Sequence, residues 1–287
     1  MISNKVKLSI DTLHVVSLLN EQQQEIIYDR FVFRKNHPTH RFHYTMKMNN
    51  PLFIINSMPR NISTYKWYNT MLIFQRDILN REYVPYSIQE ILQMTTWKIK
   101  RIDLAFDFQT PTEKSLILKH HGNVQFDKNE KWSCTYLGKL KNNQSESKVA
   151  FYDRNRKEQE HNTGIVHDYH SRFEVRLYPK LNDEAVYLQS PNHDWIKKHL
   201  SKYIFIENID DLPLKNKWEK NRLYKIQKDY SYHKKLKPKE WKYLKQICKE
   251  NRVPLEMIYE QQKYDLFSFT YIKPLDELIQ QELNNAS

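Results

Sequence analysis

Apolar and polar residues alternate most regularly over residues 99–108, where Ile102, Leu104, Phe106 and Phe108 fall on one side of an extended chain. Because side chains alternate across a β-strand, this pattern predicts a strand with one face packed on a core. Stretches with a similar period predict further strands at 6–10, 31–34, 42–47, 52–55, 132–138, 148–154 and 169–178.

Helical spacing of apolar residues follows Ser63 and Thr64, and predicts a helix over residues 65–81 capped by one of the two. Further helices are predicted at 87–94, 112–120, 193–202, 217–228, 238–250, 254–261 and 274–284. The expected fold class is therefore α+β, with a mostly antiparallel central sheet, flanking helices and a helical C-terminal part. We place the boundary between the two parts near residue 200.

The composition narrows the class of protein. The chain has 287 residues, of which 39% are hydrophobic and 13% aromatic, enough to exclude a disordered polymer. No apolar stretch is long enough for a membrane-spanning helix, and we expect no membrane partner and a cytoplasmic location. Cys134 and Cys248 are too few for a disulfide framework, and three glycines are too few for the glycine-rich loops of nucleotide-driven motors.

Positive charge is concentrated in residues 213–252, which hold fourteen Lys and Arg against four Asp and Glu. This segment therefore carries +10 of the formal net charge of +12. Tyrosines and tryptophans lie between the basic residues, a pattern typical of nucleic-acid binding, although a solvated helix face is the alternative. The residues expected to contact DNA are Lys215, Lys217, Arg222, Lys225, Lys234, Lys235, Lys237 and Lys242.

Acidic side chains occupy the polar face of the strand predicted at 99–108. Asp103 and Asp107 share that face with Arg101, about 13 Å apart at ~3.3 Å per residue, too far to hold one ion on a straight strand. The strand predicted at 169–178 presents Arg172, Glu174 and Arg176 outward, and the strand at 148–154 presents Lys148, Tyr152 and Arg154.

If these three strands are neighbours, one sheet face carries carboxylates, basic groups and a tyrosine. Carboxylates bind hard cations such as Mg²⁺ or Mn²⁺, and a tyrosine hydroxyl can attack phosphorus. The alternative is a solvated face with weak ion pairs.

Four segments in order resemble the trans-acting rolling-circle replication initiators of small Gram-positive plasmids, the Rep_trans family. They are residues 100–108 (KRIDLAFDF), 134–138 (CTYLG), 151–159 (FYDRNRKEQ) and 172–177 (RFEVRL). Asp11 also lies where that family places an Asp after its first short strand, and the resemblance extends over about residues 6–180.

This resemblance implies a nickase that cuts one strand at a double-strand origin, forms a 5′-phosphotyrosine link and later religates the ends. It implies Tyr152 as nucleophile and Asp103 and Glu174 as ligands of Mg²⁺ or Mn²⁺, with Asp107 as a further site acid. Lys148, Arg154, Arg172 and Arg176 would offset phosphate charge. Residues 1–200 would form the catalytic nicking domain, with its rolling-circle nickase/relaxase-like core, and 201–287 the DNA-binding region.

The family acts as a homodimer on supercoiled origin DNA, at a hairpin or single-stranded nick site, together with a host helicase. Two alternatives stay open: a relaxase of an integrative conjugative element with the same chemistry, and a non-catalytic origin-binding protein. Tyr169 and Tyr178 are rival nucleophiles. His37, His40 and His43 could bind zinc only if the chain turns between them, and a loop or strand edge is the simpler interpretation.

Overall fold

The structure is a computed structural model that describes residues 6–49, 52–75, 86–119, 126–129, 134–137, 147–182 and 186–268. Its strands are β1 (Lys7–Ser17), β2 (Arg34–Lys35), β3 (Phe42–Asn49), β4 (Leu52–Pro59), β5 (Thr70–Gln75), β6 (Lys98–Phe108), β7 (Leu116–Lys119), β8 (Phe126–Asn129), β9 (Cys134–Leu137), β10 (Ser147–Asp153), β11 (Ser171–Leu177) and β12 (Tyr203–Ile206). Its α-helices are α1 (Glu21–Arg30), α2 (Ile62–Tyr65), α4 (Tyr86–Gln93), α5 (Arg154–Glu160), α6 (His193–Leu200), α7 (Lys217–Lys228), α8 (Pro238–Glu250) and α9 (Leu255–Leu266). Short 3₁₀ turns are η1 (Thr112–Lys114), η3 (Ile209–Asp211) and η4 (Tyr230–Lys235).

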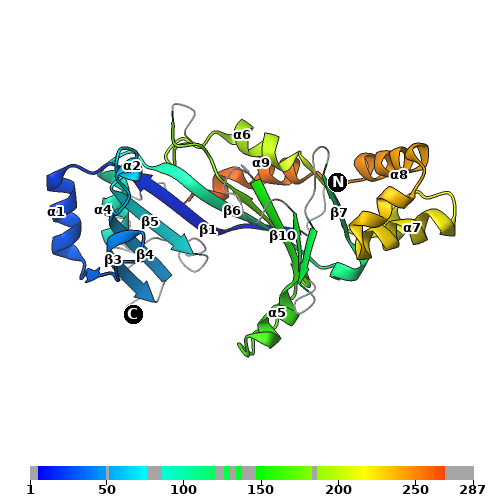
Figure 1. Ribbon diagram of the computed structural model, residues 1–287, viewed down its shortest axis with the longest axis horizontal. Coiled ribbons are helices and arrows are strands. Elements are labelled where there is room, and N and C mark those ends of the chain that lie inside the picture. Colours follow the sequence, from blue (N-terminus) through cyan, green and yellow to red (C-terminus); the bar gives the residue numbers. More distant parts are fainter. Residues whose placement is uncertain are drawn as a thin grey trace, which may run out of the picture. The chain divides into compact units, whose positions relative to one another are not determined.

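A large sheet organises the fold (Figure 1). Its strand order is β2-β3-β4-β5-β1-β6-β11-β10-β9-β8, and β12 pairs with β7 in a second, two-stranded sheet. The pairs β3–β4, β6–β11 and β10–β11 are all antiparallel. The expected α+β class with a mostly antiparallel sheet and flanking helices is therefore confirmed.

The chain divides into two compact units, each assembled from separate segments. The first unit comprises Met1–Asp11, Arg101–Pro179 and Asn192–Gln262, and the second comprises Thr12–Lys100, Lys180–Pro191 and Lys263–Ser287. The acidic strands and the basic helices therefore belong to the same unit. The functional division at residue 200 stays a prediction.

Aromatic residues form the core of the first unit under β6, β10 and β11. Phe205 of β12 lies 4.6 Å from Phe108, 5.1 Å from Phe173 and 5.4 Å from Phe151, measured between ring centroids. Phe205 thus contacts the inward face of all three strands, as their alternation predicts. The helices α6 and α9 are joined in this unit by a 2.7 Å hydrogen bond between His193 Nδ1 and the Tyr259 hydroxyl.

The basic helices have a core of their own. Leu223 and Ile226 of α7 and Leu244 of α8 pack with Leu116 and Ile206 of the two-stranded sheet. The side chain of Asn216 caps α7 by accepting from the backbone of Glu219, and Pro238 stands in the first turn of α8. Both helices begin and end at the predicted residues.

The second unit buries one face of β5 completely and the other face in part. In β5, Thr70, Met71, Leu72 and Phe74 are all buried, and β5 pairs with β4 on one side and β1 on the other. Helix α1 starts with a capping box, in which Asn20 and Gln23 each accept from the other's backbone N–H.

Two predicted helices are wrong. In place of the helix at 65–81, residues 65–75 contain the end of α2 and the strand β5, and residues 76–81 lie outside the described residues. Met71 and Phe74 at near-helical spacing belong to a continuous apolar run, whose period does not distinguish a strand from a helix. The helix predicted at 112–120 is replaced by the turn η1 and then β7, which ends at Lys119 and pairs with β12, and residue 120 lies outside the described residues. The strand at 6–10 continues to Ser17.

The sequence did not predict α1, α5, β8 or β12. The predicted helix at 274–284 lies outside the described residues. Among the described helices, none is both long and apolar enough to cross a membrane.

Candidate active site

Strand β11 lies between β6 and β10, so the three predicted strands are neighbours. The register pairs Arg172 with Asp107 on one side and with Tyr152 on the other. Three cross-strand rows result: Asp107, Arg172 and Tyr152; Ala105, Glu174 and Ala150; Asp103, Arg176 and Lys148. The predicted carboxylates, basic groups and tyrosine thus share one face of the sheet.

The acids on this face are buried. The exposed fraction is 0% for Asp107, 1% for Asp103 and 3% for Glu174. Carboxylates are rarely buried unless they are paired, because removal from water penalises the charged form. A solvated face therefore does not describe these acids, and each of them has a guanidinium partner.

We call Asp11, Asp107, Arg154 and Arg172 the Asp107 cluster. Arg172 donates from Nε to Asp107 Oδ1 at 2.7 Å and from a terminal nitrogen to Oδ2 at 2.9 Å. It also donates to Asp11 Oδ1 at 2.6 Å, and Arg154 donates to Asp107 Oδ2 at 3.0 Å. Both guanidiniums are buried, since the side chains of Arg172 and Arg154 are 4% and 6% exposed. The Asp107 cluster is therefore a fixed part of the fold.

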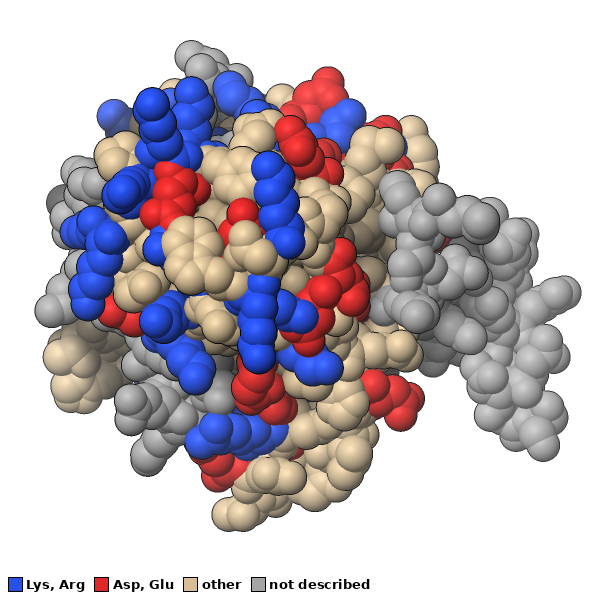
Figure 2. Space-filling model, turned by 90° about the vertical axis from the view of Figure 1, so that its right-hand side faces the viewer, with Lys and Arg blue, Asp and Glu red and all other residues tan. Residues whose placement is uncertain are grey.

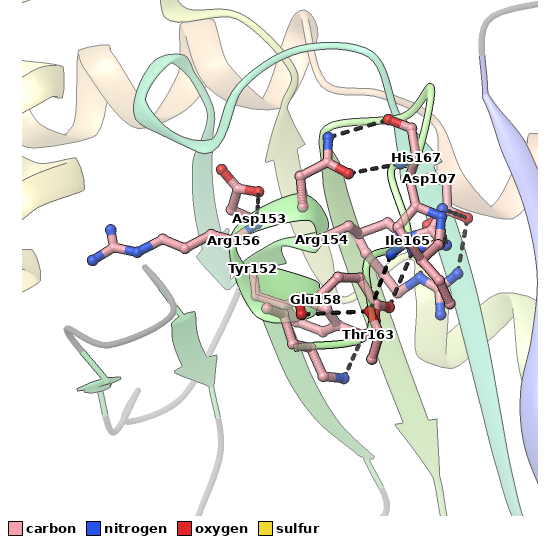
Figure 3. Close-up of polar contacts among 12 residues, drawn as sticks. Asp107, Tyr152, Asp153, Arg154, Arg156, Glu158, Thr163, Ile165 and His167 are labelled. Atoms are coloured by element: carbon pink, nitrogen blue, oxygen red, sulfur yellow. Dashed lines mark hydrogen bonds and ion pairs between the residues drawn. The ribbon is translucent and has the colours of Figure 1, made fainter. Parts of the chain in front are cut away.

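A short helix and its following loop extend this cluster (Figure 3). Arg154 begins α5, which is capped by the Asp153 side chain, and its guanidinium lies 3.0 Å from His167 Nδ1. His167 Nε2 lies 3.1 Å from Glu158 Oε1, and hydrogen bonds to Thr163 and His167 lower the pKa of Glu158. Asn155 pairs with both backbone groups of His167. The loop is thus held against the helix that follows Tyr152.

We call Asp103, Glu174, Arg101 and Arg176 the Asp103 cluster. Arg101 donates to both oxygens of Asp103, with a distance of 2.8 Å from Nε to Oδ1. Arg176 Nε lies 2.7 Å from Glu174 Oε1 and 3.7 Å from Asp103 Oδ2, so it bridges the two acids. Burial raises the pKa of Asp103 to about 6, against the opposing pull of Arg101.

Tyr152 lies at the end of β10 and is 6% exposed. Its hydroxyl donates to Glu174 Oε2 at 3.3 Å and lies 3.5 Å from Lys157 Nζ, which also stands over the ring at 4.5 Å. Burial raises the pKa of Tyr152, and the charge of Glu174 raises it further. The phenol is therefore protonated near neutral pH, with a carboxylate in position to accept its proton.

The rival tyrosines lie in different surroundings. Tyr178 is half-buried near Arg101 and Asp103, its pKa is raised by burial, and Lys148 Nζ stands 5.5 Å from its ring. Tyr169 is partly exposed in the loop before β11. Of these three tyrosines, Tyr152 is the one whose hydroxyl donates to a buried carboxylate.

The sequence interpretation missed three residues that the structure brings into the site: Arg101, Lys157 and His167. Alternation already placed Arg101 on the face of Asp103, which was the available signal. Lys157 and His167 gave none, because their places depend on an unpredicted helix and on a loop.

The residues of the Asp103 cluster fit a hard divalent cation in their chemistry. Mg²⁺ is commonly held by one or two carboxylates together with water and substrate phosphate, and Asp103 and Glu174 supply two that share Arg176. In the described part of the chain, no three His, Cys, Asp or Glu side chains come together as a complete metal site. His37 and His40 make local hydrogen bonds instead, to Thr39 and to Phe42.

Asp107 differs from the other two acids, because its arginine partners Arg172 and Arg154 are themselves buried. Its register partner is Arg172, whereas the register partner of Asp103 is Arg176. The structure therefore places the three predicted site acids in two separate clusters.

The basic helices present lysines on their surface (Figure 2). Of the predicted DNA contacts, the seven lysines are exposed: Lys215, Lys217, Lys225, Lys234, Lys235, Lys237 and Lys242. Several of them lie over aromatic rings, such as Lys225 and Lys235 over Tyr232. Arg222 is different, because it stacks on Trp218 with 3.0 Å to the ring centroid and pairs with Glu240.

Comparison with known proteins finds a likeness at the level of structure. No protein-family model matches the chain, and no curated protein matches it. Among solved structures, the chain is similar to the "Structure of Rolling Circle Replication Initiator Protein from Geobacillus stearothermophilus", with 14% identity and a TM-score of 0.40 over 86% of this chain and 98% of that one. At so low an identity and TM-score, this likeness assigns neither family nor function.

Proposed function

We propose that this chain is a rolling-circle replication initiator that nicks one DNA strand through Tyr152. The observation that carries the proposal is the hydrogen bond from the Tyr152 hydroxyl to buried Glu174. Both groups lie on the sheet face that holds the Asp103 cluster and the Asp107 cluster. A nucleophile beside a base, with cations around it, is what attack on a phosphodiester needs. Three of the four segments that resemble Rep_trans initiators contain these residues, and the fourth includes β9, which pairs with β10.

In the proposed reaction, Tyr152 Oη forms a bond to phosphorus and the bond from phosphorus to O3′ breaks. The phenol proton passes to Glu174 Oε2, its present hydrogen-bond acceptor, and the departing O3′ takes up a proton to become a hydroxyl. The 5′ phosphate stays joined to the tyrosine. Religation is the reverse attack by a 3′ hydroxyl.

Asp103 and Glu174 would hold Mg²⁺ or Mn²⁺, which would polarise the phosphate oxygens when bound. Arg176 and Lys148 lie in the same cross-strand row as Asp103 and would offset phosphate charge. Arg154 and Arg172 were predicted to do the same, but both are buried against Asp107. We assign them, with Asp107, to positioning β11 and the start of α5 around Tyr152.

DNA binding is proposed for the exposed lysines of α7, η4 and α8. Phosphate contacts from lysines give affinity that depends strongly on salt. The proposal also includes a homodimer and a host helicase. The helicase is needed because a chain without a glycine-rich phosphate loop needs another protein for ATP-driven unwinding. A conjugative relaxase would share the same chemistry and differ in its use.

The test uses purified full-length protein and a supercoiled plasmid that carries its own origin, with and without Mn²⁺ or Mg²⁺. We expect metal-dependent open circles and a protein–DNA adduct that survives SDS, with DNA attached to the Tyr152 peptide. Tyr152→Phe should lose both, while Tyr178→Phe keeps both. Binding without any cut would leave the non-catalytic origin-binding protein, and an adduct on Tyr178 would reassign the nucleophile.

A further inference from the structure

The arginines of the Asp103 cluster and those of the Asp107 cluster differ in their access to water. The side chains of Arg101 and Arg176 are 25% and 34% exposed, whereas those of Arg172 and Arg154 are 4% and 6% exposed. An arginine that reaches solvent can leave its carboxylate and be hydrated, but a buried one would leave an unpaired charge inside the protein. The arginines of the Asp103 cluster are therefore the pair that can move.

Arg101 and Arg176 bind the carboxylate oxygens that a metal ion would use. Arg101 covers both oxygens of Asp103, and Arg176 Nε sits 2.7 Å from Glu174 Oε1. A divalent cation binds carboxylate oxygen at about 2.0–2.6 Å, so it competes with a guanidinium for the same lone pairs.

Charge leads to the same conclusion. Two carboxylates and two guanidiniums make the Asp103 cluster neutral as it stands. Adding a divalent cation while both guanidiniums stay would place a net charge of about +2 in a largely buried site, which is costly. An incoming phosphodiester supplies negative charge and a planar, bidentate partner for which arginine is well suited.

We propose that Arg101 and Arg176 hold the position of the divalent cation until a DNA phosphodiester draws them away, so that DNA and metal bind cooperatively. This inference rests on the proposed function, because it takes Asp103 and Glu174 as the metal ligands. The coupling is reciprocal: DNA strengthens metal binding by the same factor by which metal strengthens DNA binding. Without bound DNA, the protein would then bind the metal weakly and would have little of the metal-bound form that cuts.

The first test measures Mn²⁺ binding without DNA, by electron paramagnetic resonance of free Mn²⁺, on full-length protein carrying Tyr152→Phe. Adding Arg101→Lys keeps the positive charge but removes the bidentate hydrogen bonding to Asp103. This substitution should tighten Mn²⁺ binding about tenfold. Arg101→Met should tighten it further. A thermal melt of each variant shows that it is folded, and Arg101→Lys remains informative if Arg101→Met does not fold.

The matched control is Arg252→Lys. Arg252 makes a two-pronged pair with Glu256 in the same unit, with a side-chain exposure of 19%. The Arg252→Lys substitution removes the same kind of contact at a position away from the site acids. It should leave Mn²⁺ affinity unchanged. If Arg101→Lys binds Mn²⁺ no better than this control, the displacement of arginine by metal is overturned.

Two further variants separate this inference from the proposed function. Asp103→Asn and Glu174→Gln should each abolish Mn²⁺ binding at the site. If they do not, the metal site itself is wrong and the proposed function loses its cofactor. If they do, but Arg101→Lys has no effect, the metal site stands and the inference fails.

The final measurement adds the single strand that the plasmid experiment shows to be cut. In the Tyr152→Phe protein we expect this strand to tighten Mn²⁺ binding about tenfold. The gain should shrink when Arg101→Lys is also present, because the ammonium group that replaces the guanidinium competes less strongly for Asp103. An equal gain in both proteins would show that the coupling does not pass through Arg101.

Discussion

Replacing Asp107 with asparagine tests whether this buried acid holds the fold or binds metal. Asp107 is fully buried and accepts three hydrogen bonds from the guanidiniums of Arg172 and Arg154, which are themselves almost inaccessible to water. Asp107→Asn removes the charge and leaves two buried cations, one of which keeps Asp11 as a partner.

The size of the effect follows from that arrangement. Breaking a buried ion pair by removing one partner costs about 3–5 kcal/mol. For a chain of this size, about 2–4 °C is lost per kcal/mol, so the melting temperature should fall by about 6–20 °C. Circular dichroism melts and urea titrations measure this, provided that unfolding is reversible.

The matched control is Asp210→Asn. Asp210 also has two partners, Lys220 at 2.7 Å and the Tyr224 hydroxyl at 2.8 Å, but it lies at the surface, so its loss should hardly change the melting temperature. Mn²⁺ binding supplies the second readout, which Asp107→Asn should preserve and Asp103→Asn should abolish. A melting temperature for Asp107→Asn close to wild type, or loss of Mn²⁺ binding in a folded Asp107→Asn protein, would refute the positioning role.

Three other predictions follow from the same structure. Changing the three exposed lysines Lys234, Lys235 and Lys237 to alanine should weaken DNA binding and lower the slope of log affinity against log salt by about 2–3, measured by fluorescence anisotropy; an unchanged slope would exclude them as phosphate contacts. Burial lowers the pKa of Lys100, which donates to the Tyr68 hydroxyl, to about 8. Because unfolded chain keeps that proton up to about pH 10.4, stability relative to Lys100→Met should rise from pH 8 toward that value in urea titrations, and a flat difference would contradict the shift. Burial raises the pKa of the Cys248 thiol to about 12, so iodoacetamide should modify it only in unfolded protein, as read by mass spectrometry.

Local patterns in the sequence were enough for the elements whose own residues specify them. The alternation in β6 predicted which side chains lie together, and the N-cap Asn216 and the first-turn Pro238 mark the starts of α7 and α8. The kinds of groups in the site were predictable for the same reason, because a strand separates its two faces whatever its neighbours are.

Other elements depend on partners far away in the chain. Strand β7 exists because Leu116 and Leu118 pair with Ile206 and Ile204 of β12, and a helical pattern over the same residues could not show this. Strand β5 pairs with β4 and β1, but its residues 71–74 are all apolar, which removes the alternation that distinguishes a strand from a helix.

The sequence by itself determined that Asp103, Glu174 and Tyr152 point to the polar side of their strands and that positive charge gathers on the last helices. Tertiary structure decided that this polar side is buried, that Asp107 belongs to Arg172 and Arg154, and that Arg101 covers Asp103. The physical reason is that the side of a strand to which a side chain points depends on the period of that strand alone. Burial and ion pairing depend on which strands become neighbours and on what covers them.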